Sequence, residues 1–430
     1  MLAMLLLLFA GLMALGVPIA FSMGIASATF FTVNGNGLVQ FAQRVVAGAD
    51  SFTILAIPFF MLSGDIMGKG GVSRRILRFA NALIGFVRGG LAVTSVVSCA
   101  LFGAICGSAP ATAVAVGGIM APDMVKRGYK KSFTATIFGV GGCLGLIIPP
   151  SLVMVMLGST GGISIGDLFL GGFIPGIIMT ALLCIYCVQQ SKKHNYGIEG
   201  GETVFDLREL GLSFVDALLP LTIPIFILGS ITFGIATPTE AAVISVVWSM
   251  VLSMLVYREI SIKEMVQIFS NASVTAAGVT AIMAAASALS WALAVENIPA
   301  TVSTFFMRYV DNQLLFFLCV YVIVFFLGCV TEAVSIIVIL TPILMPVSNQ
   351  LGIDPIHFGL FMTMVLTIGA VTPPVGLSMI AAGKVIGVKI EDTFPEIVHC
   401  LVIMTIVTVL VALFPGLSTW LPRTLSALAQ

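Results

Sequence analysis

The residues of this chain that could do chemistry inside a membrane stand where its apolar segments are interrupted. One interruption is Gly107 in GSAPAT, a glycine with small polar neighbours, and the tandem proline Pro149-Pro150 in LIIPPS follows it. A second pair of interruptions, GCVTEAVS around Gly328 and VTPPVG around Pro373, repeats the same order. The glycine-to-proline spacings are 42 and 45 residues. We therefore expect a chain of two related halves, and paired interruptions of this kind indicate the binding site of a secondary transporter.

The composition excludes a soluble globular domain. Of the 430 residues, 59% are hydrophobic and only 9% are charged, and the mean hydropathy is +1.15. Soluble domains usually carry about 25% charged residues. The net charge of +0 gives no sign of a nucleic-acid partner. The sequence therefore predicts an all-α polytopic membrane protein.

The apolar segments predict that each half has five crossings and one re-entrant helical hairpin. The hairpin arms are shorter than the ~20 residues that cross a bilayer, and an odd number of crossings makes the second half inverted relative to the first. The predicted segments are a first repeat at 1–195 with hairpin 91–122 and broken helix 132–160, a cytoplasmic linker at 196–212, and a second repeat at 213–430 with hairpin 313–345 and broken helix 356–383. Surface segments are expected at 38–49, 261–270 and 297–311, and a separate crossing at 272–294.

The distribution of positive charge predicts the orientation. If the first hairpin opens to the cytoplasm, all of the 19 Lys and Arg residues except Arg44, Arg308 and Arg423 fall on the inner side. Cytoplasmic connections of membrane proteins carry an excess of Lys and Arg. The opposite orientation would violate this rule.

The tandem prolines indicate cation sites. A proline removes a backbone donor and displaces the carbonyl one turn earlier, which leaves oxygens that suit a hard cation such as Na⁺. We expect two quasi-equivalent Na⁺ sites formed mainly by backbone carbonyls. The first would use Cys106, Gly107, Ser108, Gly145 and Ile148, and the second Gly328, Gly369, Thr372 and Val375.

The hairpin tips indicate an anion site. Helix N-termini carry about half a positive charge and free N–H groups, which suit a carboxylate, and no basic residue is expected deep in the membrane. An anionic substrate would therefore rely on the tips and on Ser108, Thr112, Ser151 and Thr372. Glu332, at the second tip, is either a substrate-site residue or a helix N-cap partner.

Several motifs together resemble a known family. They are GSAPATAVAVGG with Pro122, KRGY, LIIPPS, SIGDLFLGGFIPG at 164–176, TPTEAA, GIDPIHFG and VTPPVG. The chain is similar over its whole length to the large membrane subunit, M subunit or DctM type, of tripartite ATP-independent periplasmic (TRAP) transporters.

This resemblance implies a Na⁺-driven uptake system of the bacterial cell inner membrane. A soluble periplasmic substrate-binding protein would deliver an organic acid, of the sialic acid or C4-dicarboxylate class, to this subunit and a small four-helix membrane subunit. The resemblance also implies an elevator mechanism, in which the hairpins and broken helices move through the lipid bilayer against a scaffold.

Two alternatives remain open at this point. A Na⁺-coupled divalent-anion symporter also uses inverted hairpins, but it works without a binding protein. An intramembrane enzyme would need a nucleophile with a base or a paired aspartate at depth. Ser108 has no deep histidine, and Asp65 has no obvious mate.

Overall fold

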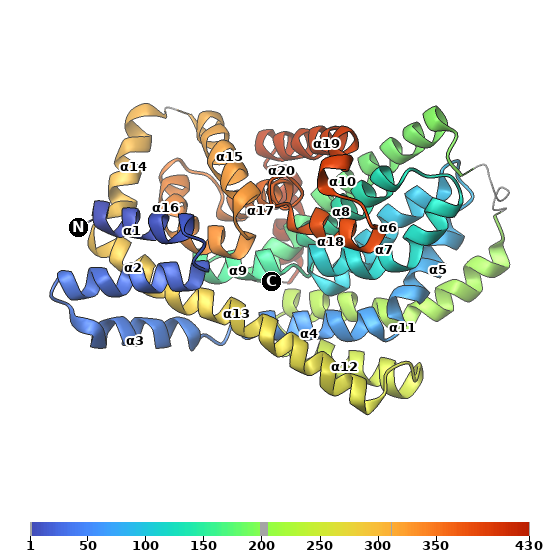
Figure 1. Cartoon of the computed structure of the whole chain (residues 1–430), viewed down its shortest axis with the longest axis horizontal. Helices are drawn as coiled ribbons and strands as arrows, with labels where there is room; N and C mark the ends of the chain where they lie inside the picture. The colour runs from blue at the N-terminus through green and yellow to red at the C-terminus, as the bar shows by residue number, and fades with distance from the viewer. Residues whose placement is uncertain (1, 198–204, 311, 430) are drawn as a thin grey trace.

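The structure, a computed structural model, describes residues 2–197, 205–310 and 312–429, and within them it contains helices and no β-strand (Figure 1). Eight helical segments of this described part are long and apolar enough to cross a membrane. The α-helices are α1 (Leu2–Ala14), α2 (Ile19–Val33), α3 (Gly37–Ala49), α4 (Ala56–Lys69), α5 (Val72–Ile84), α6 (Gly90–Cys106), α7 (Ala109–Lys126), α8 (Lys131–Ile147), α9 (Leu152–Gly161), α10 (Ile165–His194), α11 (Leu207–Thr232), α12 (Pro238–Met250), α13 (Ile262–Val295), α14 (Ile298–Tyr309), α15 (Gln313–Val330), α16 (Ala333–Gln350), α17 (Pro355–Gly369), α18 (Leu377–Ile386), α19 (Phe394–Leu413) and α20 (Gly416–Ala429).

Local sequence signals explain where several helices begin. Thr237 and Glu240 form a capping box at the start of α12, and Ser261 and Glu264 form one at the start of α13. In each box the hydroxyl accepts a backbone N–H and the carboxylate accepts the N–H of the capping residue, which satisfies two donors that a helix end leaves free.

Three helices differ from the sequence prediction. The segments 261–270 and 272–294 form one helix, α13, because no Gly or Pro breaks the chain between them. Helix α16 continues through Pro342 and Pro346 to Gln350, five residues past the predicted end of the hairpin. The amphipathic helix α20 was not predicted. Of the predicted linker at 196–212, residues 207–212 already belong to α11, and residues 198–204 lie outside the described residues.

One group of helices forms a long support along one side of the molecule. Helix α13 packs on α2, α3 and α4, and α12 packs on α4. In Figure 1, α13 runs obliquely beneath the hairpin helices, with α3 at one end and α12 at the other. We call α2, α3, α4, α11, α12 and α13 the support helices.

A second group contains the interrupted helices, and its two halves are interlocked. Hairpin helices α6 and α7 pack on α8, while α15 packs on α17. The second segment of each broken helix contacts the other half, because α18 packs on α7 and α8, and α9 packs on α16. A hydrogen bond of 2.6 Å from the Ser378 hydroxyl to the Gly139 carbonyl joins the two broken helices. We call α6, α7, α8, α9, α15, α16, α17 and α18 the hairpin body.

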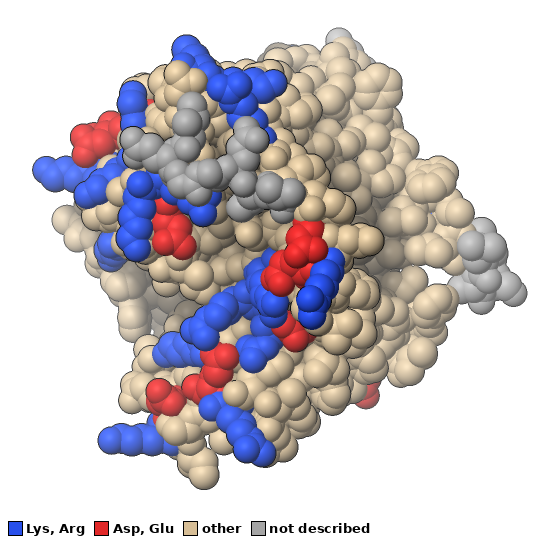
Figure 2. Space-filling model, turned by 90° about the vertical axis from the view of Figure 1, so that its right-hand side faces the viewer, with Lys and Arg blue, Asp and Glu red and all other residues tan. Residues whose placement is uncertain are grey.

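The charged side chains gather at one end of the molecule. Figure 2 shows Lys and Arg concentrated on the face that includes α5 and the beginning of α11, among a smaller number of acidic side chains. There Arg78 donates to Glu209 and Asp216 of α11, and Arg75 donates to Glu259 at 3.0 Å. The two carboxylates raise the pKa of Arg78. In the orientation predicted from the sequence, this face would lie on the cytoplasmic side.

Candidate functional site

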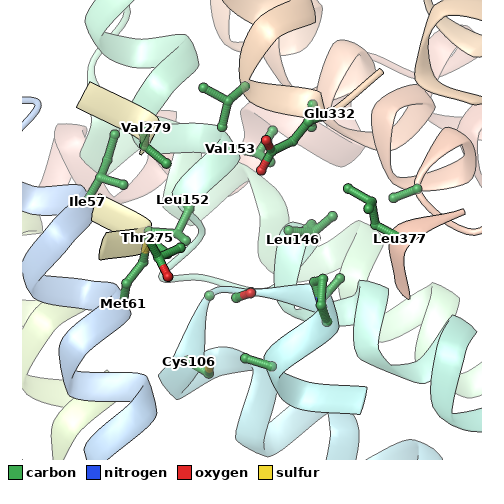
Figure 3. Close-up of a pocket in the computed structure, with 18 of the residues that line it drawn as sticks. Ile57, Met61, Cys106, Leu146, Leu152, Val153, Thr275, Val279, Glu332 and Leu377 are labelled. Atoms are coloured by element: carbon green, nitrogen blue, oxygen red, sulfur yellow. The ribbon is translucent and has the colours of Figure 1, made fainter. Parts of the chain in front are cut away.

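A cavity of about 320 Å³ lies between the hairpin body and the support helices. Figure 3 shows Ile57, Met61 and Thr275 on one side of the cavity, Leu377 on the other, and the Glu332 carboxylate pointing inward. Its lining residues come from both hairpin tips, both helix breaks, α4 and α13. They are Ile57, Met61, Asp65, Cys106–Ala111, Leu146, Leu152, Val153, Met156, Thr275, Val279, Glu332–Val334, Ala370, Leu377 and Ser378.

The first hairpin tip is a turn of two residues, Gly107 and Ser108, and its first position requires glycine. Helix α6 ends at Cys106, Gly107 has a φ of 64°, and Ser108 is extended before α7 begins. A Cβ on Gly107 would lie 2.9 Å from the Pro150 carbonyl oxygen. The Gly107 carbonyl accepts the Leu152 N–H at 3.4 Å. The tip is therefore seated on the first helix break, as the close approach of backbone to backbone requires.

The second hairpin turns at Glu332, within the GCVTEAVS motif where the sequence placed its tip, and not at Gly328, which the spacing paired with Gly107. Helix α15 continues to Val330, and the turn consists of Thr331 and Glu332. Gly328 lies within α15 and packs on Gly369, just as Gly103 packs on Gly145 in the first half. The counterpart of Gly328 is therefore Gly103 and not Gly107, because both are contact glycines between a hairpin and a broken helix.

Four helix N-termini converge on the cavity. Residues of the first turn of α7, α9, α16 and α18 all line it, represented by Ala109, Leu152, Ala333 and Leu377. Neither Ser108 nor Glu332 makes a side-chain capping hydrogen bond to its helix, so the first N–H groups of α7 and α16 are not capped by them. Aligned helix dipoles place partial positive charge at these ends. These helix ends can therefore hold an anion by their N–H groups, although no described Lys, Arg or His lines the cavity and two carboxylates, Asp65 and Glu332, do.

The structure brings two of the five predicted substrate residues to the cavity, Ser108 and Glu332. The other three hydroxyl groups face the backbone or a neighbouring side chain. Ser151 donates to the Leu146 carbonyl at 2.6 Å, and Thr372 donates to Ile368 at 2.7 Å. The buried Thr112 hydroxyl lies beside the Cys106 thiol.

The prediction that Thr112, Ser151 and Thr372 contact the substrate is therefore not supported by their placement. Ser151 and Thr372 instead hold the two breaks in shape. Ser151 does so most directly, because its hydroxyl also accepts the Met154 N–H and caps α9.

Backbone carbonyls of the first predicted cation set have lone pairs to spare. The oxygens of Cys106, Gly145 and Ile148 accept no hydrogen bond from any described residue, whereas those of Gly107 and Ser108 accept the N–H groups of Leu152 and Thr112. Gly145 precedes Pro149 by four residues, so the proline cannot supply the N–H that a helix would. The Leu146 carbonyl, four residues before Pro150, is satisfied by the Ser151 hydroxyl instead.

The second predicted cation set has a small cavity of its own. A cavity of about 20 Å³ is lined by Gly328, Glu332, Val375 and neighbouring residues, and a space of roughly 10–15 Å³ already holds one water-sized particle. The carbonyls of Gly328, Thr372 and Val375 accept no hydrogen bond within the described part of the chain. The Gly369 carbonyl is taken by the Thr372 N–H at 3.0 Å. Three of the four predicted residues thus offer unpaired oxygens.

Sequence reasoning missed three polar residues of the large cavity: Asp65, Thr275 and Ser378. Asp65 was considered only as an enzyme's aspartate. The signal that could have found it is an acidic residue within an apolar segment, which marks a functional site by default. Thr275 and Ser378 carry no such signal, because single hydroxyl residues are common in membrane helices.

Comparisons with known proteins agree with this architecture. Residues 6–417 match the family model described as tripartite ATP-independent periplasmic transporter, DctM component. The chain is 37% identical over 405 residues to the C4-dicarboxylate TRAP transporter large permease protein DctM of Pseudomonas aeruginosa, covering 94% of each chain. It is 32% identical over 414 residues to the sialic acid TRAP transporter large permease protein SiaM of Vibrio cholerae, covering 96% of each.

A longer relative and a solved structure complete the comparison. The chain is 36% identical over 410 residues to the isethionate TRAP transporter permease protein DctMQ of Oleidesulfovibrio alaskensis, covering 95% of this chain but only 64% of that protein. The crystal structure of the Alcanivorax borkumensis YdaH transporter, described as having an unusual topology, matches with a TM-score of 0.61 at 11% identity, covering 89% of each chain. This last likeness concerns the fold alone.

Proposed function

The chain belongs to the DctM component family of TRAP transporters, and from this premise we propose that it takes up an organic acid by Na⁺-coupled secondary active transport. It is a multi-pass permease of the inner membrane and not an enzyme. Relatives are named for C4-dicarboxylate, isethionate and sialic acid, which are all organic acids.

The observation that carries this proposal is the convergence of four helix N-termini on one cavity without a basic side chain. Each N-terminus contributes about half a positive charge, and those of α7 and α16 also have first-turn N–H groups that no side chain caps. The first turns of α7 and α16 bind the carboxylate of the substrate. The opposite ends of the interrupted helices present carbonyl oxygens, so anion and cation groups lie next to each other at membrane depth, where free backbone groups cost several kcal/mol unless they are used.

The groups that would hold Na⁺ are the unpaired carbonyls at the two breaks and on the hairpin helices beside them. Cys106, Gly145 and Ile148 would form one set, and Gly328, Thr372 and Val375 the other. Bound Na⁺ would supply positive charge beside an anion site that lacks Lys and Arg. The chain's own residues keep the oxygens in place, through the Ser151 bond to Leu146 and the Thr372 bond to Ile368.

We further propose an elevator mechanism in which two inverted repeats supply the moving part. The hairpin body would move as one unit, because glycine contacts join each hairpin to its broken helix and Ser378 joins the two breaks. The support helices would remain fixed. Gly64 of α4 packs directly against Cys106 of the first tip, and this contact between the two groups would be remade during transport.

The partners in this proposal are a small four-helix membrane subunit and a soluble periplasmic binding protein. The isethionate relative is named DctMQ and is longer than this chain, which supports a second membrane component. The test is uptake into proteoliposomes that contain this chain with its small subunit, with and without a Na⁺ gradient and with and without the binding protein. Uptake that needs both supports the proposal. Uptake without binding protein would favour the divalent-anion symporter, and uptake indifferent to Na⁺ would exclude Na⁺ coupling.

A further inference from the structure

Asp65 is a carboxylate that the support helices present to the substrate cavity. It lies in α4 and lines the large cavity. Its neighbour Gly64 packs against Cys106, so this part of α4 abuts the first hairpin tip. The Asp65 side chain makes no hydrogen bond or salt bridge with any described residue, and the charge that acts on it, Lys69, is exposed one turn away and does not line the cavity.

The cavity contains one other charged group among its described lining residues, Glu332. Its situation differs from that of Asp65. Glu332 also lines the cavity of about 20 Å³ beside the carbonyls of Gly328 and Val375, so a cation at the second break would compensate its charge. Of these two cavities, Asp65 lines the large one and not the small one. Its oxygens are therefore left for the substrate, because a charged group taken from water needs a partner.

We propose that Asp65 accepts a hydrogen bond from a hydroxyl or ammonium group of the substrate. The cavity then selects organic acids with one carboxylate and a separate donor group, and it disfavours plain dicarboxylates. This inference rests on the proposed function, in which the helix N-termini bind the carboxylate. It narrows the substrate class by naming the hydrogen-bond donor that the substrate carries at the end remote from its carboxylate.

The electrostatic reason is the sign of the charge that Asp65 faces. A second carboxylate about 5 Å from Asp65 would be repelled, and at an effective dielectric constant of about 20 this disfavours it on the order of 100-fold. An ammonium group at the same place gains a charge-assisted hydrogen bond instead. A hydroxyl group donates a hydrogen bond to Asp65 without repulsion. An acid that carries it should bind more tightly than the dicarboxylate and less tightly than the acid with an ammonium group.

The test compares four acids that share one carbon chain. They are butanoate, 4-hydroxybutanoate, 4-aminobutanoate and succinate, which differ only in the group remote from one carboxylate. Their dissociation constants are measured by thermal stabilisation of the purified full-length chain in lipid nanodiscs, with and without Na⁺. We expect 4-aminobutanoate and 4-hydroxybutanoate to bind at least tenfold more tightly than succinate.

The variant Asp65→Asn removes the charge and keeps the shape. We expect the preference for 4-aminobutanoate over succinate to fall at least tenfold. Asp392→Asn is the matched control, because Asp392 is an exposed aspartate between α18 and α19, outside the cavity.

The outcomes separate this inference from the proposed function. Butanoate binding that depends on Na⁺, together with equal or tighter succinate binding or an unchanged preference in Asp65→Asn, would overturn the role of Asp65 alone. Failure of all four acids to bind in Na⁺ would overturn both.

Discussion

Gly103 and Gly145 bring α6 and α8 into backbone contact, since a Cβ on Gly145 would lie only 2.8 Å from the Gly103 Cα. Gly328 and Gly369 make the same contact between α15 and α17, with a distance of 2.7 Å from a Cβ on Gly369 to the Gly328 Cα. Each hairpin is thus fixed to its own broken helix. The geometry of the tips relative to the breaks depends on these two glycine pairs.

Alanine at Gly145 should separate the first hairpin from its broken helix. The new methyl group would meet the backbone of Gly103, which cannot rotate away as a side chain could. Overpacking of this kind costs roughly 1–3 kcal/mol. We expect Gly145→Ala to lower the unfolding temperature and to abolish Na⁺-driven uptake. Gly118→Ala on α7 is the control, because a Cβ there meets nothing within 4 Å. Normal uptake by Gly145→Ala would show that the contact is dispensable.

A disulfide between Gly64→Cys and the native Cys106 should arrest transport. A Cβ on Gly64 would lie 3.3 Å from the Cys106 Cβ, near the ~3.8 Å of disulfides. In a chain whose other seven cysteines are replaced, oxidation should block uptake and reduction should restore it. Gly68→Cys is the control, because its nearest neighbour is the Phe102 ring. Undiminished uptake by the cross-linked protein would contradict movement of the tip past α4.

Thr372→Val should weaken the affinity for Na⁺ without unfolding the protein. The lost bond to Ile368 loosens the end of α17 beside the carbonyls of the second cation set. We expect the Na⁺ concentration for half-maximal uptake to rise about tenfold, equivalent to about 1.4 kcal/mol. Thr408→Val on α19 removes an equivalent buried bond, to Met404, away from the breaks. If both variants shift equally, Thr372 has no special relation to the cation.

Glu332→Gln should also raise the Na⁺ requirement, by at least tenfold, because it removes the negative charge that faces the small cavity. Uptake at saturating Na⁺ should recover in large part, since the glutamine keeps the shape of the tip. Glu391→Gln, at an exposed glutamate outside both cavities, serves as the comparison. A Na⁺ dependence identical to that of the unmodified chain would rule out a cation beside Glu332.

The sequence alone located the interruptions because glycine and proline act through their own backbone. The α6 helix ends at Cys106, directly before Gly107, and the first broken helix is interrupted between Ile147 and Leu152, at the LIIPPS motif. Composition likewise determined the all-helical membrane class, since apolar length is a property of each segment alone. The spacing wrongly paired Gly328 with Gly107, because a glycine that makes a helix contact and a glycine at a hairpin tip cannot be told apart in sequence.

Only the tertiary structure decided which side chains face the cavity. Asp65 and Thr275 reach it from α4 and α13, about 210 residues apart, while Ser151 and Thr372 turn their hydroxyls to nearby carbonyls. One residue along a helix turns the side chain by about 100°. Which direction meets the cavity is therefore determined by how distant helices pack, and no local pattern contains that information.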